Sequence, residues 1–273
     1  MFFRKKIKEE IKEEIKDNKR KEIFTNFITH AEEIIKKPSN EEVHPIYIFL
    51  KQITDHLTFE GALSSYRDVN ANIPFEIASI FEGSNFHFQK ELITRILTEK
   101  PHIEDMDIYR QHHFKLFEFI FNRKFNNSPI VLNPWDKDRI TDAITKIAIE
   151  ENIFNSEKFK HNVENTYYYP LGILVCTNGN HSQYSAKLKG QGQTHIREIV
   201  DISNLFEYME FDGEYNYCKS TSEEGLTEIV KFPLNTDTEF YAGVIFEIGR
   251  LLNENIKIIP TDIYNCIKNA KSI

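Results

Sequence analysis

The sequence predicts an α+β fold in which a helical N-terminal layer packs on a small mixed-sheet core that is followed by C-terminal helices. Apolar residues recur every three or four positions through most of residues 1–125, as in amphipathic helices. Short apolar runs bounded by turn residues follow, and the clearest of these, residues 171–176, is typical of a buried strand. Helical spacing returns near the C-terminus. We therefore divide the chain into a helical region, 1–125, and an α/β region with a helical extension, 126–273.

Bulk composition narrows the classes of function. The chain has 273 residues, of which 40% are hydrophobic and 28% charged, as in ordinary soluble globular proteins. Its formal net charge of -8 gives no general attraction to nucleic acid, so such contact would need a local basic patch. Three dispersed cysteines without CxxC spacing indicate neither a disulfide framework nor a zinc site, and a reducing cytoplasm is the expected location. We expect no secretory signal and no membrane span.

The N-terminal region opens with one long helix at residues 3–37, because isoleucines and phenylalanines form a stripe while Lys and Glu fill the other face. Its exposed face offers a surface for self-association or for a protein partner. The isoleucine repeat is too short to indicate a coiled coil. The same spacing predicts helices at 44–58, 75–82, 86–99 and 104–125, with a loop-like stretch at 59–74.

The α/β region begins after a turn-forming cluster with a short strand at 130–132. The turn Asn133-Pro134-Trp135-Asp136 follows, and either Asp136 or Asp138 can cap the next helix. A loop is expected at 153–170, followed by a strand at 171–176, a helix at 181–189 capped by Gly190, and a strand at 194–202. Residues 204–220 are expected to form a short helix and then a hairpin around Asp212-Gly213. A strand at 227–233, a helix at 237–254 capped by Asp237 or Thr238, and a helix from 260 to about 270 follow.

The segment Asn178-Gly179-Asn180-His181-Ser182 lies where a buried strand turns into a helix. Free backbone N–H groups and the positive end of the dipole attract anions at a helix start. Gly179 permits a positive φ or a close approach to a ligand. Asn180 is a good cap, and Lys187 on the same helix and Arg139 on the preceding one can add positive charge. The pattern therefore predicts a phosphate site, although a capped turn without a ligand explains it as well.

The order of elements resembles the ParB/sulfiredoxin-like superfamily over about residues 129–202. The matching segments are Ile130-Val131-Leu132-Asn133-Pro134, then Leu174 to Ser182, then Ala186-Lys187-Leu188-Lys189-Gly190. The whole chain also resembles a bacterial family of unknown function that carries this Gly-Asn-His-Ser signature. The superfamily resemblance implies binding of a nucleotide, such as ATP or CTP with Mg²⁺, or of nucleic-acid phosphate, with contacts from Gly179, Asn180, His181 and Ser182.

Two departures from the superfamily pattern bear on catalysis. Ser182 stands where Arg is usual, which removes a bidentate phosphate contact, and Asn178 stands where Asp is frequent. If the site is catalytic, His181 is the expected general acid or base, while Asp136 or Asp138 can hold Mg²⁺ or orient a nucleophile. Three functions stay open: a nucleotide-dependent enzyme or switch, a non-catalytic DNA- or protein-binding module of a phage-defence or mobile-element system, and a metal-dependent nuclease.

Overall fold

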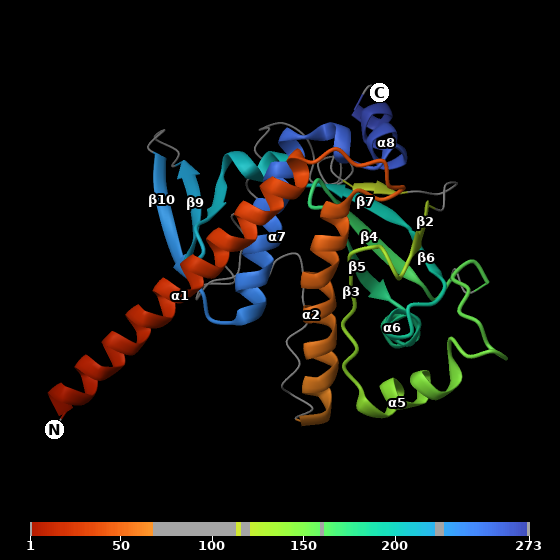
Figure 1. The fold of residues 1–273 in the computed structure, drawn as a ribbon, viewed down its shortest axis with the longest axis horizontal. Coiled ribbons are helices and arrows are strands. Elements are labelled where there is room, and N and C mark those ends of the chain that lie inside the picture. Colours follow the sequence, from red (N-terminus) through yellow and green to blue (C-terminus); the bar gives the residue numbers. More distant parts are fainter. Residues whose placement is uncertain (1, 68–112, 116–120, 159–160, 222–226, 272–273) are drawn as a thin grey trace.

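The computed structural model of the chain describes residues 2–67, 113–115, 121–158, 161–221 and 227–271 (Figure 1). The helices are α1 (Phe2–Lys36), α2 (Pro45–Arg67), α5 (Lys137–Lys146), α6 (Asn180–Leu188), α7 (Asp237–Glu254) and α8 (Thr261–Lys271), with short 3-10 helices η2 (Ser203–Glu207) and η3 (Ile256–Ile258). The strands are β1 (His113–Lys115), β2 (Phe121–Lys124), β3 (Ile130–Val131), β4 (Glu164–Tyr169), β5 (Ile173–Asn178), β6 (Gln193–Ile196), β7 (Glu198–Asp201), β8 (Met209–Phe211), β9 (Tyr215–Thr221) and β10 (Thr227–Pro233). The described helices include none that is long and apolar enough to cross a membrane.

A mixed five-stranded sheet is the centre of the fold, in the order β1-β7-β4-β5-β3. Strand β3 runs parallel to β5, and β4 runs parallel to β7, whereas the β4–β5 and β1–β7 pairs are antiparallel. Strands β10, β9 and β8 form a separate antiparallel sheet, and β2 pairs with β6. The fold class is therefore mixed α/β, as the sequence predicts.

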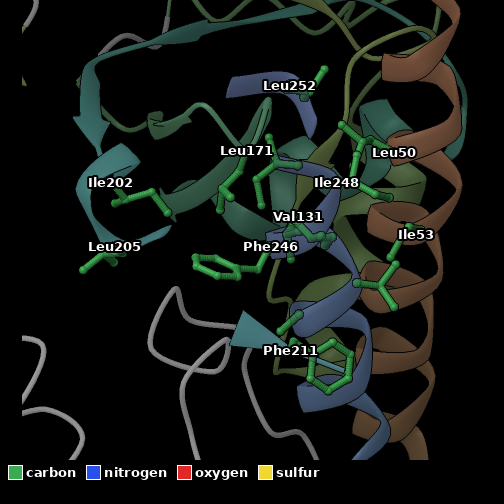
Figure 2. Packing of buried hydrophobic residues seen from close by; sticks show 14 of the residues in the cluster. Leu50, Ile53, Val131, Leu171, Ile202, Leu205, Phe211, Phe246, Ile248 and Leu252 are labelled. Atoms are coloured by element: carbon green, nitrogen blue, oxygen red, sulfur yellow. The ribbon is translucent and has the colours of Figure 1, made fainter. Parts of the chain in front are cut away.

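Helices cover both faces of the central sheet. Side chains alternate along a strand, so Ile173 and Val175 of β5 join a cluster with residues of α1, α2 and α7. Their neighbours Leu174 and Cys176 join a second cluster with residues of α5, α6 and α8. Figure 2 shows the first cluster, in which side chains of α2 and α7 meet across the sheet edge. This burial on both faces explains why β5 is a continuous apolar run rather than an alternating one.

Two expectations for the N-terminal region are wrong. Residues 113–115 and 121–124, which fall within the helix predicted at 104–125, form strands β1 and β2. An apolar run rich in Phe and Ile fits a buried strand as well as a helix, and pairing with β7 and β6 decides between them. The loop predicted at 59–74 is helical as far as Arg67. The helices predicted at 75–82 and 86–99 lie outside the described residues.

The α/β region also corrects the sequence-based prediction. The loop expected at 153–170 contains β4, a central strand, whose Asn, Thr and Tyr side chains lack a clear apolar pattern. The single strand expected at 194–202 is two strands, β6 and β7, which belong to different sheets and meet at Arg197. Helix α7 is capped by Thr236, one residue before the predicted caps. The other predicted helices and strands, including α1, α8 and the hairpin at Asp212-Gly213, are confirmed within a few residues.

Candidate functional site

The start of α6 follows directly from the end of the buried strand β5. Gly179 joins them with a positive φ of 86°, a conformation that side chains with a Cβ rarely adopt. A Cβ on this residue would stand 2.6 Å from the carbonyl oxygen of Asn162. Glycine is therefore required both by the backbone conformation and by the close approach of a neighbouring segment.

The two turns selected from the sequence lie side by side. Strands β3 and β5 are adjacent and parallel, so the turns that follow them emerge at the same edge of the sheet. The backbone N–H of Asn133 donates to Asn180 Oδ1 at 2.7 Å, and the N–H of Asp136 donates to His181 Nε2 at 3.3 Å. These two bonds fix the Asn133–Asp136 turn against the first turn of α6, so the structure brings the two turns together.

The acidic residues at the start of α5 have separate positions. Asp136 is the N-cap of α5, and its Oδ1 accepts from the backbone N–H groups of Asp138 and Arg139 at 2.9 and 3.0 Å. The N–H of Arg139 is the main reason that the pKa of the Asp136 carboxyl lies below its usual range. Asp138 is exposed in the first turn of the same helix. Capping is thus the structural role of Asp136.

His181 is held as a neutral imidazole. Its side chain is buried, and its ring meets the edge of the Trp135 ring at 4.5 Å between centroids. Burial and, to a smaller extent, the Arg139 charge lower the pKa of His181, and with the opposing effect of Asp136 it lies at about 4. Nε2 accepts a hydrogen bond from the Asp136 N–H, so in the neutral ring the proton is assigned to Nδ1. A neutral ring supplies no positive charge to a bound anion near neutral pH.

The first turn of α6 presents unused hydrogen-bond donors. Asn180 is not the cap that the sequence predicts, because Gly179 occupies that position and the Asn180 amide oxygen is bonded to Asn133. The Asn178 side chain accepts the Gly179 N–H at 2.9 Å. In the described part of the chain, the N–H groups of Asn180, His181 and Ser182 have no acceptor. Ser182 is half-buried in this first turn.

Lys187 does not reach this site. Its side chain is fully buried, its Nζ lies 2.5 Å from Asp55 Oδ1 of α2, and it donates to the carbonyl oxygen of Ile130 at 2.9 Å. Desolvation lowers the pKa of Lys187 to about 8, although Asp55 opposes this shift. The phosphate-binding role expected for Lys187 is therefore corrected, because the turn of the helix directs residue 187 inward. Arg139, by contrast, lies at the site, with its guanidinium 5.5 Å from the Trp135 ring centroid.

Two features of the site were missed by sequence reasoning. Trp135, the only tryptophan in the chain, is 52% exposed beside His181. Its place within the polar Asn-Pro turn was the signal in the sequence that this aromatic side chain lies at the surface rather than in the core. Beneath the turn, the buried amide of Gln183 bonds to Asn165 Oδ1, to the carbonyl oxygen of Asn178 and to Thr194 Oγ1. This network makes the turn rigid from below.

Among the residues that the structure describes, no group of three His, Cys, Asp or Glu side chains is placed to hold a metal ion. No curated protein and no solved structure matches the chain. One family model does match, over residues 6–258, and its description is a family of unknown function. The chain therefore belongs to DUF6710, a family of unknown function.

Proposed function

We propose that this protein binds a phosphate group, carried by a nucleotide or a nucleic acid, at the first turn of α6. The observation that carries the proposal is the set of three consecutive N–H groups, at Asn180, His181 and Ser182, without an acceptor in the described residues. Donors of this kind, aligned with the positive end of a helix dipole, bind phosphate without a charged side chain. The two hydrogen bonds from the Asn133–Asp136 turn keep these donors in place before a ligand arrives.

Trp135 gives the site a surface for a ring. Its exposed indole stands beside His181, and Arg139 lies over its ring. A nucleobase stacks on such an aromatic face, and the Arg139 guanidinium adds positive charge near the phosphate. The proposed ligand therefore has a base on Trp135 and a phosphate at α6. ATP or CTP, with Mg²⁺ brought by the nucleotide, fits this description.

The resemblance to a ParB/sulfiredoxin-like core is part of the same proposal. Its support is the order β3, α5, β4, β5, α6, with β3 parallel to β5 and both polar turns at one sheet edge. Binding is favoured over catalysis. The neutral His181 ring has one nitrogen engaged by the Asp136 N–H, and Asp136 itself caps a helix. We retain His181 as the general acid or base if a reaction takes place, with Asp136 or Asp138 as its acidic partner.

The exposed Trp135 also favours a non-catalytic DNA- or protein-binding module of a bacterial defence or mobile-element system. The N-terminal half of α1 extends away from the rest of the molecule (Figure 1), which gives a protein partner or a second copy access to it. A metal-dependent nuclease is the third candidate, with the metal carried by the nucleic acid and one of the acidic residues of α5. Binding and cleavage assays separate these candidates.

The test uses two variants at one position. Ser182→Asp adds a negative charge at the start of α6, which stabilises the helix but repels phosphate, whereas Ser182→Asn has the same shape without the charge. Thermal unfolding is followed with ATP, CTP, GTP and ADP, with and without Mg²⁺, and the fluorescence of Trp135 is recorded in the same titrations. A ligand at 100 times its Kd stabilises the folded state by about 2.7 kcal/mol.

We expect a nucleotide to raise the melting temperature and change Trp135 emission in the wild type and in Ser182→Asn, but not in Ser182→Asp. If no nucleotide shifts the melting temperature of the wild type, binding and cleavage of single-stranded and plasmid DNA are measured with Mg²⁺ or Mn²⁺. DNA binding without cutting supports the module, and metal-dependent cutting supports the nuclease. The proposal is contradicted if no nucleotide or DNA changes the melting temperature of the wild type, or if a nucleotide changes it equally in Ser182→Asp and Ser182→Asn.

A further inference from the structure

A second site lies at the opposite end of β5. A cavity of about 570 Å³ opens where this strand begins, at the other end of the strand from the start of α6. Separate parts of the chain line it, among them the α1–α2 loop, α2, β2, the β4–β5 turn, β6 and the start of α8. Its volume is within the range of small-molecule sites, which commonly form where several elements meet.

The floor of the cavity is rigid and amphipathic. Tyr47, Tyr167 and Leu174 are all buried there. The Tyr47 hydroxyl donates to the carbonyl oxygen of Ile258 at 3.4 Å, and burial raises the pKa of both tyrosines, so both hydroxyls stay neutral. Gly172 approaches so closely that a Cβ would stand 2.7 Å from the Tyr47 ring. The apolar surface and the two hydroxyls are therefore fixed in advance.

One wall carries both signs of charge. Nη2 of Arg123, from β2, lies 3.0 and 2.8 Å from the two carboxylate oxygens of Asp262, in the first turn of α8. Nη1 of Arg123 donates to the carbonyl oxygen of Asn122 at 3.1 Å. These bonds leave the Nε–H and one Nη1–H of Arg123 without an acceptor in the described residues, and Asp262 Oδ2 keeps accepting capacity.

The rim repeats this arrangement, since Lys124 and Glu42 form an exposed pair at 3.4 Å. The four charges sum to zero. A ligand with a large net charge would therefore leave charge uncompensated in a half-buried wall, which is unfavourable. A ligand that carries one charge of each sign satisfies the unused Arg123 donors and the Asp262 oxygen together.

We propose that this cavity binds a small zwitterion of the α-amino-acid class, with its carboxylate on Arg123, its ammonium on Asp262 and its side chain over Leu174 and the two tyrosine rings. This site is independent of the phosphate site. It lies at the other end of β5 and uses none of the residues around α6. An amino acid would therefore bind whether or not a nucleotide binds at Ser182.

The test uses the full chain and calorimetric titration. The common amino acids are screened first, and the one that binds best is compared with its carboxylic acid lacking the amine and with its amine lacking the carboxylate. Adenosine and uridine serve as neutral ligands without separated charges. We expect the zwitterion to bind and each singly charged analogue to bind about ten- to a hundredfold more weakly, since each loses one charged hydrogen-bonded partner.

Two variants and one control locate the binding. Arg123→Gln removes the carboxylate partner, and Gln193→Trp fills the cavity from strand β6 at a position that belongs to neither ion pair. Arg67→Gln removes an exposed arginine paired with Glu60 elsewhere on the surface and is the matched control. We expect Kd to rise about tenfold or more in Arg123→Gln, binding to be lost in Gln193→Trp, and Kd to be unchanged in the control.

Circular dichroism melts confirm that each variant folds. If Arg123→Gln does not fold, Gln193→Trp and the two charged analogues still decide the question. The proposal is overturned if no amino acid binds, if the nucleosides bind and amino acids do not, if the charged analogues bind as well as the zwitterion, or if Gln193→Trp leaves Kd unchanged.

Discussion

Two glycines flank α6, and both have a left-handed backbone, with φ of 86° at Gly179 and 63° at Gly190. They differ in their surroundings. A Cβ on Gly179 would stand 2.6 Å from the Asn162 carbonyl oxygen and 3.3 Å from Val163, whereas among the described residues nothing lies within 4 Å of a Cβ on Gly190. Replacing each by alanine therefore separates the cost of the backbone conformation from the cost of the close approach.

The backbone conformation alone costs a residue with a Cβ about 1–2 kcal/mol. We expect this loss of unfolding free energy in Gly190→Ala. In Gly179→Ala, the same cost is joined by the displacement of a backbone carbonyl, and forcing extra atoms into a packed site costs about 1–3 kcal/mol more. The expected loss at Gly179 is therefore about 2–5 kcal/mol, and the excess over Gly190 measures the contact with Asn162.

Urea unfolding followed by circular dichroism gives both values, with the denaturant slope compared between variants. Equal losses of unfolding free energy in Gly179→Ala and Gly190→Ala would contradict the close contact with Asn162, because the turn would then have room that the structure does not give it. A third variant, Gly179→Asn, tolerates the left-handed conformation better than alanine but meets the same carbonyl. It is expected to recover only part of the loss.

Three further predictions concern the interior around the site. Asp55→Ala leaves the buried Lys187 ammonium without its carboxylate and is expected to lower the free energy of unfolding in urea by about 3–5 kcal/mol. The double variant Asp55→Leu with Lys187→Met removes both charges and is expected to recover most of that loss. If it recovers nothing, Lys187 and Asp55 are not a charged pair. His181 is expected to titrate near pH 4 by NMR rather than near 6.5. As the pH falls, the histidine of the unfolded chain is protonated near pH 6.5, before His181 of the folded chain. The free energy of unfolding is therefore highest above about pH 6.5 and decreases toward pH 4. A His181→Gln variant that shows the same decrease would refute the assignment. Gln183→Leu leaves buried partners such as Thr194 unpaired and is expected to lower the free energy of unfolding by about 1–3 kcal/mol. A negligible change would mean that water replaces the amide of Gln183.

The long helix α1, the apolar strand β5, the turn into α6 and the helices α7 and α8 could all be predicted from sequence, because each depends on local spacing or on turn chemistry. Strand β4 could not. Its tyrosines and polar residues are placed at the sheet centre by pairing with β5 and β7, which no local pattern reveals. The strands β1 and β2 failed as predictions for the same reason, since their phenylalanine-rich sequence suits a helix until distant strands pair with it.

The sequence by itself determined that Asn178–Ser182 forms a strand-to-helix turn with glycine at its bend, because only glycine adopts that backbone conformation readily. Tertiary structure decided how the turn is used. The parallel pairing of β3 with β5 brings the Asn133–Asp136 turn against His181, and burial is the main reason that this histidine is neutral. The rotation of α6 against the sheet directs Lys187 inward to Asp55. Burial and long-range contact therefore place this lysine in the interior, so the backbone donors of α6 are the groups that the proposed phosphate would contact.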